Sequence, residues 1–263
     1  MPVQSGPARV MNLEERRKLR KILLFGHTIA RVAIVLAVLP VAIGCDCIFK
    51  ADFNSDMVDS PPDTMLPALP PGDWLTLDTS AGDILVRASV GDLTDQPVEV
   101  RTTGGTGGVT LLGTVGGRPP TTGTWVGSWR GMVQADSEPQ VASGMVLRDS
   151  RGLILAHVGY MGGGIIDFNN LFTFSGIGVA WTPDVSQLFE VTIDLDAKTV
   201  SLAVDGVPIP SCQNLAYMDA AAVDLARMSF SVGLTTPQAF ALDDLSICAV
   251  PRDVDVVPVT RPK

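Results

Sequence analysis

The sequence predicts an all-β protein, an antiparallel β-sandwich preceded by an N-terminal signal or anchor helix and a disordered tether. The chain contains 26 glycines and 19 prolines among 263 residues, which favours many turns and few long helices. Apolar and polar residues alternate from Phe189 to Asp196, the period of a half-buried strand. We expect a signal or anchor segment at 1–44, a tether at 45–73, the sandwich at 74–250 and a tail at 251–263.

A basic stretch followed by an apolar run opens the chain. Five Lys or Arg lie between Arg16 and Lys21, and no charged residue occurs from Val32 to Gly44. As a helix this run would measure about 20 Å, less than the roughly 30 Å hydrocarbon core of a bilayer. It therefore predicts the apolar part of a signal peptide. Because the basic cluster stays in the cytoplasm, we expect everything after residue 45 to be exported.

Cys45 ends the apolar run in the setting Val41-Ala42-Ile43-Gly44-Cys45-Asp46. This segment resembles a bacterial lipobox, although Ala42 stands where that family usually has Leu. The resemblance implies a diacylglyceryl group on the Cys45 sulfur and cleavage before Cys45. The acidic Asp46 resembles an inner-membrane retention signal. The alternative is an uncleaved anchor helix, since counting back to His27 gives roughly spanning length. Either reading places the protein in the cell envelope, membrane-anchored and facing the periplasm or the surface.

The exported part of the chain is acidic. The whole chain carries −9, but beyond residue 31 there are 12 Lys/Arg against 26 Asp/Glu, a net −14. We expect no nucleic-acid partner, because such binding requires basic neutralisation of phosphates. The same charge argues against electrostatic adhesion to anionic lipid. Within 45–73, aspartates alternate with prolines, a composition typical of an extended, solvated spacer.

Short runs of strand-forming residues follow one another after Trp74, separated by turn residues. We expect strands at 84–90, 98–102, 109–115, 124–135, 145–148, 153–160, 189–196, 200–204, 228–234 and 240–247. Turns are predicted at Asp149–Gly152 and Asp205–Gly206. The segment 212–225 is the best candidate for a helix or irregular structure.

The last expected strand changes phase. Phe240 and Leu242 are apolar at even positions, whereas Leu245 and Ile247 are apolar at odd positions. A strand cannot move its apolar side chains to the other face without an extra residue. We therefore predict a β-bulge or bend at Asp243-Asp244.

Two segments carry a resemblance to a known fold family. The stretch from Phe189 to Gly206 contains a strand, a turn, a second strand and Asp-Gly, and the segment Ala239–Ile247 places Asp243-Asp244 before an apolar residue. Both resemble the concanavalin A-like (laminin-G-like) jelly rolls, over roughly residues 124–250. The resemblance implies a jelly-roll sandwich. It does not choose a function, because the family includes lectins, adhesion modules, glycosidases and structural appendages.

Four cysteines occur in the chain. Cys45 is the lipidation candidate. Cys212 and Cys248 are the two in the expected sandwich, and in an oxidising compartment they are the candidate disulfide. Cys47 is left over, as a free thiol or an intermolecular partner. No Cys/His spacing of a zinc site is present.

Candidate chemistry is sparse. The jelly-roll glycosidases that this fold resembles carry a Glu-x-Asp-x-x-Glu strand, which the chain lacks. His157 alternates with apolar neighbours, so we expect it on the opposite face as a polar strand position. Trp125, Trp129 and Tyr160 are candidates for a carbohydrate-binding platform, with core packing as the alternative. Asp243 and Asp244 are candidate calcium ligands, with bulge chemistry as the alternative; no other cofactor is expected.

The predicted function is a non-catalytic surface module. It would bind glycan or another envelope protein, and it would contact the membrane through lipid on Cys45 or an anchor helix. One alternative is a glycan-active enzyme on the same scaffold. The other is a structural subunit of an extracellular assembly, with the tail 251–263 adding a strand to a neighbour.

Overall fold

Fifteen strands make up most of the described chain, which comprises residues 47–63, 74–104, 108–115, 117–135, 137, 142–169, 177–233 and 237–251 of the computed structural model. The first sheet contains β1 (Cys47–Ala51), β3 (Gly82–Val86), β4 (Val98–Thr102), β6 (Thr124–Val133), β10 (Gln187–Asp194), β11 (Thr199–Val204), β12 (Val207–Pro208), β13 (Leu215–Ala216) and β15 (Gln238–Ala249). The second contains β2 (Trp74–Asp78), β5 (Gly108–Thr114), β7 (Ala142–Arg148), β8 (Ile154–Met161), β9 (Ile165–Phe168) and β14 (Arg227–Gly233).

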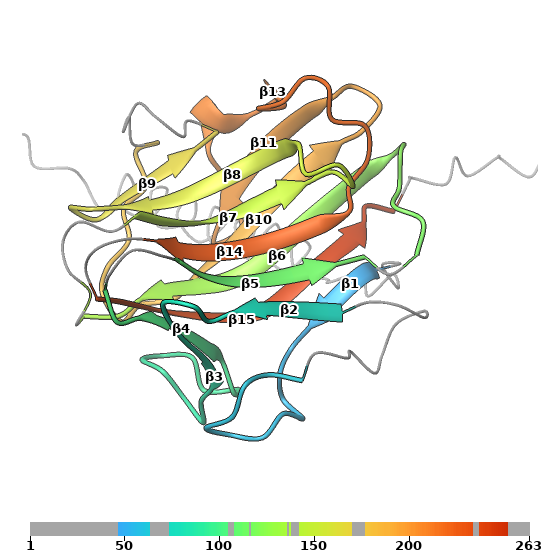
Figure 1. Cartoon of the computed structure of the whole chain (residues 1–263). Helices are drawn as coiled ribbons and strands as arrows, with labels where there is room; N and C mark the ends of the chain where they lie inside the picture. Colours follow the sequence, from blue (N-terminus) through green and yellow to red (C-terminus); the bar gives the residue numbers. More distant parts are fainter. Residues whose placement is uncertain are drawn as a thin grey trace, which may run out of the picture. The chain divides into compact units, whose positions relative to one another are not determined.

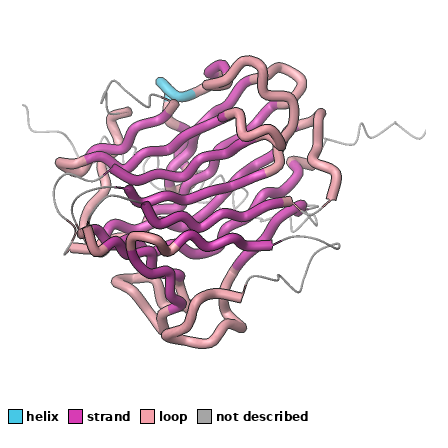
Figure 2. Tube along the Cα trace, in the orientation of Figure 1, coloured by secondary structure: helices cyan, strands magenta, loops and turns pink. Residues whose placement is uncertain are grey.

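The two sheets are antiparallel and lie face to face (Figure 1), which confirms the predicted sandwich. The first runs β12-β11-β10-β6-β15-β4-β3, with β1 beside β15 and β13 beside β11; the second runs β2-β5-β14-β7-β8-β9. One 3₁₀ turn, Pro210–Cys212, is the helical element of the described residues (Figure 2). No described helix has the length and apolar character needed to cross a membrane.

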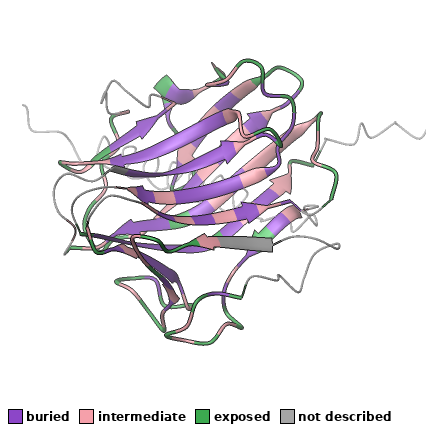
Figure 3. Cartoon of the chain, in the orientation of Figure 1, coloured by how far each residue is buried: buried purple, intermediate pink, exposed green. Residues whose placement is uncertain are grey.

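The core lies between the sheets, where inward side chains of both meet (Figure 3). Period-two alternation works as predicted in β10, where Phe189, Val191 and Ile193 are buried and the residues between them are partly exposed. Trp129 of β6 stacks on Phe189 with ring centroids 5.3 Å apart, and Tyr160 of β8 meets Phe189 edge-on at 5.6 Å. These aromatic contacts tie the two sheets together.

The predicted tether is wrong for its first half. Residues 47–51 form β1, which pairs with the second half of β15, and Phe49 and Phe53 are buried in the core. Further along, the Asp59 N–H donates to Val86 O at 2.7 Å, and the Val86 N–H donates to Ser60 O at 2.8 Å. The sandwich therefore begins at Cys47 rather than at residue 74. Sequence composition missed this because a short apolar stretch beside aspartates does not reveal a partner strand that lies about 200 residues further on.

The predicted disulfide is also wrong. Cys248 is bonded to Cys47, not to Cys212, and Cys212 is a free, buried thiol. The register of β1 on β15 places Cys47 directly opposite Cys248. Cys212 lies in the 3₁₀ turn after β12 and behaves as a small apolar residue. Its burial raises the pKa of its thiol, which keeps it protonated and unreactive.

The predicted bulge in β15 is confirmed. The register of β15 on β6 shifts between Asp243 and Ser246, and Asp244 has a φ of 54°. The extra residue lets Leu242 and Leu245 both point into the core. It also divides β15 in two, because β4 pairs with its first half and β1 with its second half.

Candidate functional site

The structure places the three candidate aromatic residues in or against the core. Trp129 and Tyr160 are 0% and 1% exposed, so neither can stack on a sugar, and that prediction is wrong for both. Trp125 is partly buried against the core, and its Nε1–H donates to Thr122 O at 3.0 Å. The alternative reading, core packing, holds because the face that Trp125 and Trp129 share is the inner face of the first sheet.

Asp243 and Asp244 do not converge on one point. Asp243 is 4% exposed and accepts a hydrogen bond from the Asp244 N–H at 2.8 Å, whereas the Asp244 carboxylate approaches Arg130 Nε at 3.7 Å. Burial, helped by the charge of Asp244, raises the pKa of Asp243 to about 7. Among the described residues no three acidic, His or Cys side chains gather as a metal would require. The structure thus gives no support to calcium at this bulge.

A buried ion cluster occupies the β3–β4 edge of the first sheet. Glu99 accepts from Arg87 Nη2 at 2.7 Å, from Arg101 Nη2 at 3.1 Å and from Gln134 Nε2 at 2.8 Å. Burial alone would raise the pKa of Glu99, but these donors together lower it. Because Arg87, Arg101 and Gln134 all donate to this carboxylate, we infer that the cluster stabilises the fold and is not a reactive site.

The outer face of the second sheet contains a different kind of polar group. His157 lies on the opposite side of β8 from Val158 and Tyr160, as predicted. Asp167 of β9 faces outward as well, because it pairs with Gly159, two residues from His157. In an antiparallel pair such diagonal neighbours are within reach of long side chains.

Two glycines make room for the His157 ring. A Cβ atom on Gly144 would lie 2.6 Å from His157 Nε2, and one on Gly159 would lie 2.7 Å from His157 Cε1. The imidazole ring therefore packs against the backbone of β7 and β8 at these two glycines. Next to Gly144 on β14 is Ser231, whose Oγ is 3.0 Å from Thr110 Oγ1. We call His157, Asp167, Gly144, Gly159 and Ser231 the outer-face patch.

Both ionisable side chains of the outer-face patch are buried and incompletely hydrogen-bonded. His157 is 9% and Asp167 is 2% exposed, and within the described part of the chain neither His157 Nδ1 nor Asp167 Oδ1 has a hydrogen-bond partner. Burial, together with the charge of Arg148, lowers the pKa of His157 to about 4. Burial raises the pKa of Asp167, and the Phe168 backbone partly offsets this. The imidazole is thus neutral at pH 7 and the carboxyl is biased towards its neutral form.

The unpartnered atoms are the main sign of function. A buried polar atom without a partner costs about 1–3 kcal/mol, and native proteins contain few of them. Two such atoms lie at diagonal positions of one sheet face, and the side chains that carry them, His157 and Asp167, have shifted pKa values. Perturbed groups of this kind cluster at functional sites. Because His157 and Asp167 are 9% and 2% exposed, the arrangement can donate to and accept from the hydroxyl groups of a ligand only where the surface over it opens.

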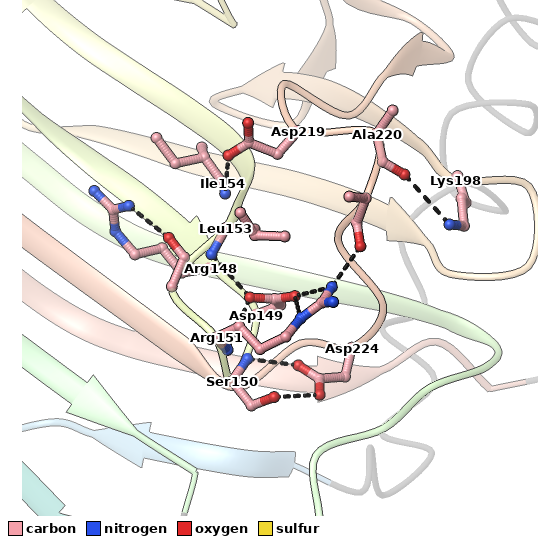
Figure 4. A network of polar contacts seen from close by, with 12 residues as sticks. Arg148, Asp149, Ser150, Arg151, Leu153, Ile154, Lys198, Asp219, Ala220 and Asp224 are labelled. Atoms are coloured by element: carbon pink, nitrogen blue, oxygen red, sulfur yellow. Dashed lines mark hydrogen bonds and ion pairs between the residues drawn. The ribbon is translucent and has the colours of Figure 1, made fainter.

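A second polar network, drawn in Figure 4, is fully satisfied. Asp149, at the end of β7, is 0% exposed and accepts from Arg151 Nη2 at 2.8 Å and from the Leu153 N–H at 2.8 Å. Arg151 also donates to Ala221 O, and the Ser150 Oγ–H donates to Asp224 Oδ2 at 2.7 Å. These bonds fasten the segment 217–226 to the β7–β8 turn, which is a structural role.

Carboxylates on the outer face of the second sheet are far apart. Successive cross-strand partners run through Asp78, Thr110, Ser231, Gly144, Gly159 and Asp167. Five steps of about 4.8 Å put Asp78 roughly 24 Å from Asp167. Glycosidases need their two carboxyl groups about 5–10 Å apart. The described strand residues of this face therefore hold no such pair.

Comparison with solved structures identifies the fold. The chain matches a sialidase with a TM-score of 0.57 and 9% identity, over 81% of this chain and 19% of that chain. It matches the catalytic domain of a glycoside hydrolase family 131 protein from Coprinopsis cinerea with a TM-score of 0.52 and 14% identity, over 78% of this chain and 95% of that chain. This chain thus spans about a fifth of the sialidase chain. At these identities the likeness shows a jelly-roll β-sandwich and no more. No protein-family model and no curated protein matches the chain.

Sequence reasoning identified one member of the outer-face patch and missed the others. It placed His157 on the correct face but took it for an ordinary polar position. It did not identify Asp167, Gly144 or Gly159 as candidates. The available signal was the spacing of His157 and Gly159, because a glycine two residues along a strand leaves space on the same face. The partner strands that complete the patch are set by tertiary pairing.

Proposed function

We propose that this chain is an exported, lipid-anchored, non-catalytic module that binds glycan through the outer-face patch. The observation that carries the proposal is the pair of unpartnered atoms, His157 Nδ1 and Asp167 Oδ1, on one face of the second sheet. A sugar hydroxyl can both donate and accept, so one ligand group can satisfy either atom. Satisfying both would recover part of the cost of burying them.

The comparisons favour the same ligand class. The two fold neighbours reported above are, by name, a sialidase and a glycoside hydrolase catalytic domain. Binding is favoured over hydrolysis because Asp78 and Asp167 are too far apart to act on one bond. With Trp129 and Tyr160 in the core, recognition would rest on hydrogen bonds to hydroxyl groups rather than on stacking.

The anchor part of the proposal rests on residues 16–46, which lie outside the described residues. Intact mass of the membrane-extracted protein tests it. Loss of residues 1–44 with an added acyl mass, both absent in a Cys45→Ala variant, is the expected result. A full-length, unmodified mass refutes lipidation.

Glycan binding is tested with the folded domain on an array of purified microbial polysaccharides, followed by titration calorimetry on the strongest hit. The Asp167→Asn variant keeps the shape of the side chain but replaces one carboxyl oxygen with an NH2 group that can only donate, and we expect it to weaken binding at least about tenfold. The matched control is Glu190→Gln, on the outer face of the first sheet, which should bind as wild type does. Equal weakening by both variants, or no binding to any arrayed polysaccharide, refutes the proposal. Release of reducing ends would favour an enzyme instead.

A further inference from the structure

One end of the sandwich brings together loops that are distant in sequence. The Val250 N–H donates to Thr124 O at 2.9 Å, and the Leu195 N–H donates to Gly123 O at 3.0 Å. On the second sheet the Leu225 N–H donates to Pro120 O at 3.1 Å, and the Figure 4 network ties 217–226 to the β7–β8 turn. We call this surface the anchor-side end. It comprises the strand termini and loops at 117–124, 148–153, 194–198, 217–227 and 249–251.

Charge is distributed very unevenly between the anchor-side end and the remainder of the described chain. The anchor-side end holds five of the nine described Lys/Arg and five of the twenty described Asp/Glu, so its net charge is zero. The remaining described residues hold four basic side chains against fifteen acidic ones, a net −11. The basic residues of the end are Arg118, Arg148, Arg151, Lys198 and Arg227. The net charge of the whole chain conceals this asymmetry.

Exposed groups on the anchor-side end suit a lipid headgroup layer. Arg118 and Lys198 are exposed, and Arg151 is 52% exposed at its side chain. Val223 and Val250 are large apolar residues that are 46% and 39% exposed. Basic and apolar side chains together are what an interfacial surface presents to phospholipid.

The proposed lipid anchor precedes β1 in the sequence, and β1 begins at this same end of the sandwich. β1 runs antiparallel to β15, so its first residue, Cys47, lies near the C-terminal end of β15, where Val250 also lies. The Cys47–Cys248 disulfide fixes this end of β1 to the sheet. The spacer expected from composition does not intervene.

We infer that the anchor-side end is a membrane-contact surface that fits a phospholipid bilayer, so that the sandwich stands on the membrane with its strands pointing away from it. The inference rests on the membrane attachment in the proposed function. In this orientation the acidic body lies farther from anionic headgroups than the roughly 8 Å over which charges act at physiological salt. The outer-face patch then faces sideways, parallel to the membrane plane.

Two exposed valines at opposite ends of the strands provide the test. Val223 lies on the anchor-side end. Val207, which is 62% exposed, follows the far end of β11. In a Cys212→Ser background, Val223→Cys and Val207→Cys would each carry an environment-sensitive fluorophore on the full, membrane-extracted chain. The protein would be reconstituted in vesicles of phosphatidylcholine and phosphatidylglycerol that contain a headgroup nitroxide quencher.

We expect the Val223 label to be quenched at least threefold more than the Val207 label. Adding Arg118→Glu and Lys198→Glu should reduce that ratio at low salt. Equal quenching at both positions in protein that carries the acyl mass overturns the orientation while leaving the anchor intact. Protein that lacks the acyl mass and does not enter the vesicles overturns the proposed anchor, and the orientation falls with it.

Discussion

The Cys47–Cys248 disulfide joins β1 to β15 across a sequence separation of 201 residues. A cross-link of this kind stabilises a fold chiefly by restricting the unfolded chain, and the restriction grows with loop length. For a loop of about 200 residues the chain-entropy model predicts about 5 kcal/mol at 25 °C, while measured effects are usually about 2–4 kcal/mol. We therefore expect the Cys47→Ser/Cys248→Ser variant to lower the free energy of unfolding by about 3–5 kcal/mol. That is a large fraction of the roughly 5–15 kcal/mol available to a typical domain.

Urea denaturation of the folded domain, followed by tryptophan fluorescence, measures the effect. Reductant should shift the wild-type transition to that of the double variant and leave the double variant itself unchanged. Cys212→Ser is the control, since Cys212 is a free thiol; its response to reductant should match that of wild type. A wild-type transition that reductant does not move, or a non-reducing peptide map that links Cys212 to Cys248, would refute the reasoning.

Three further substitutions test local features. His157 has its pKa lowered from 6.5 to about 4 in the folded protein, so its own contribution to stability should fall by about 3 kcal/mol as the pH drops from 6.5 to 4. The pKa of Asp243, raised to about 7, acts in the opposite direction over the same range, so the test is the difference in urea-unfolding free energy between wild type and His157→Gln, which should shift by about 3 kcal/mol in favour of the variant. Asp244 has a φ of 54°, so Asp244→Val should cost about 1–2 kcal/mol more than Asp244→Gly, which thermal unfolding would show; equal costs would contradict a strained bulge. A Cβ on Gly131 would clash with Tyr160 Oη, so Gly131→Ala should cost about 1–3 kcal/mol, and less in a Tyr160→Phe background; an unchanged cost in that double-mutant cycle would contradict the clash.

Local periodicity was enough to predict most of the strands and the defect in the last one. Alternation in β10 and β11 reports which side chains share a face, because a strand repeats every two residues. The phase change between Leu242 and Leu245 required an extra residue, and the structure has it at Asp244. These features depend on neighbours within a few residues, so they are visible in the sequence itself.

Periodicity alone could not show which face of a strand is buried in the core. Trp125 and Trp129 share one face of β6, but only packing against Phe189 shows that this face is the inner one. Composition was also insufficient at β1, where Phe49 and Ala51 are followed by an aspartate-rich segment. Their burial depends on β15, about 200 residues away in the sequence.

The sequence by itself determined the alternation of the strands and the bulge, since each is a property of contiguous residues, and the acidic net charge, which follows from composition. Tertiary structure alone decided the partner of Cys248, the outer-face patch and the division of charge between the anchor-side end and the remaining described residues. The physical reason is common to all three. Antiparallel pairing places residues from distant segments opposite one another, and the register that does so is set by core packing across the whole sandwich rather than by any local signal.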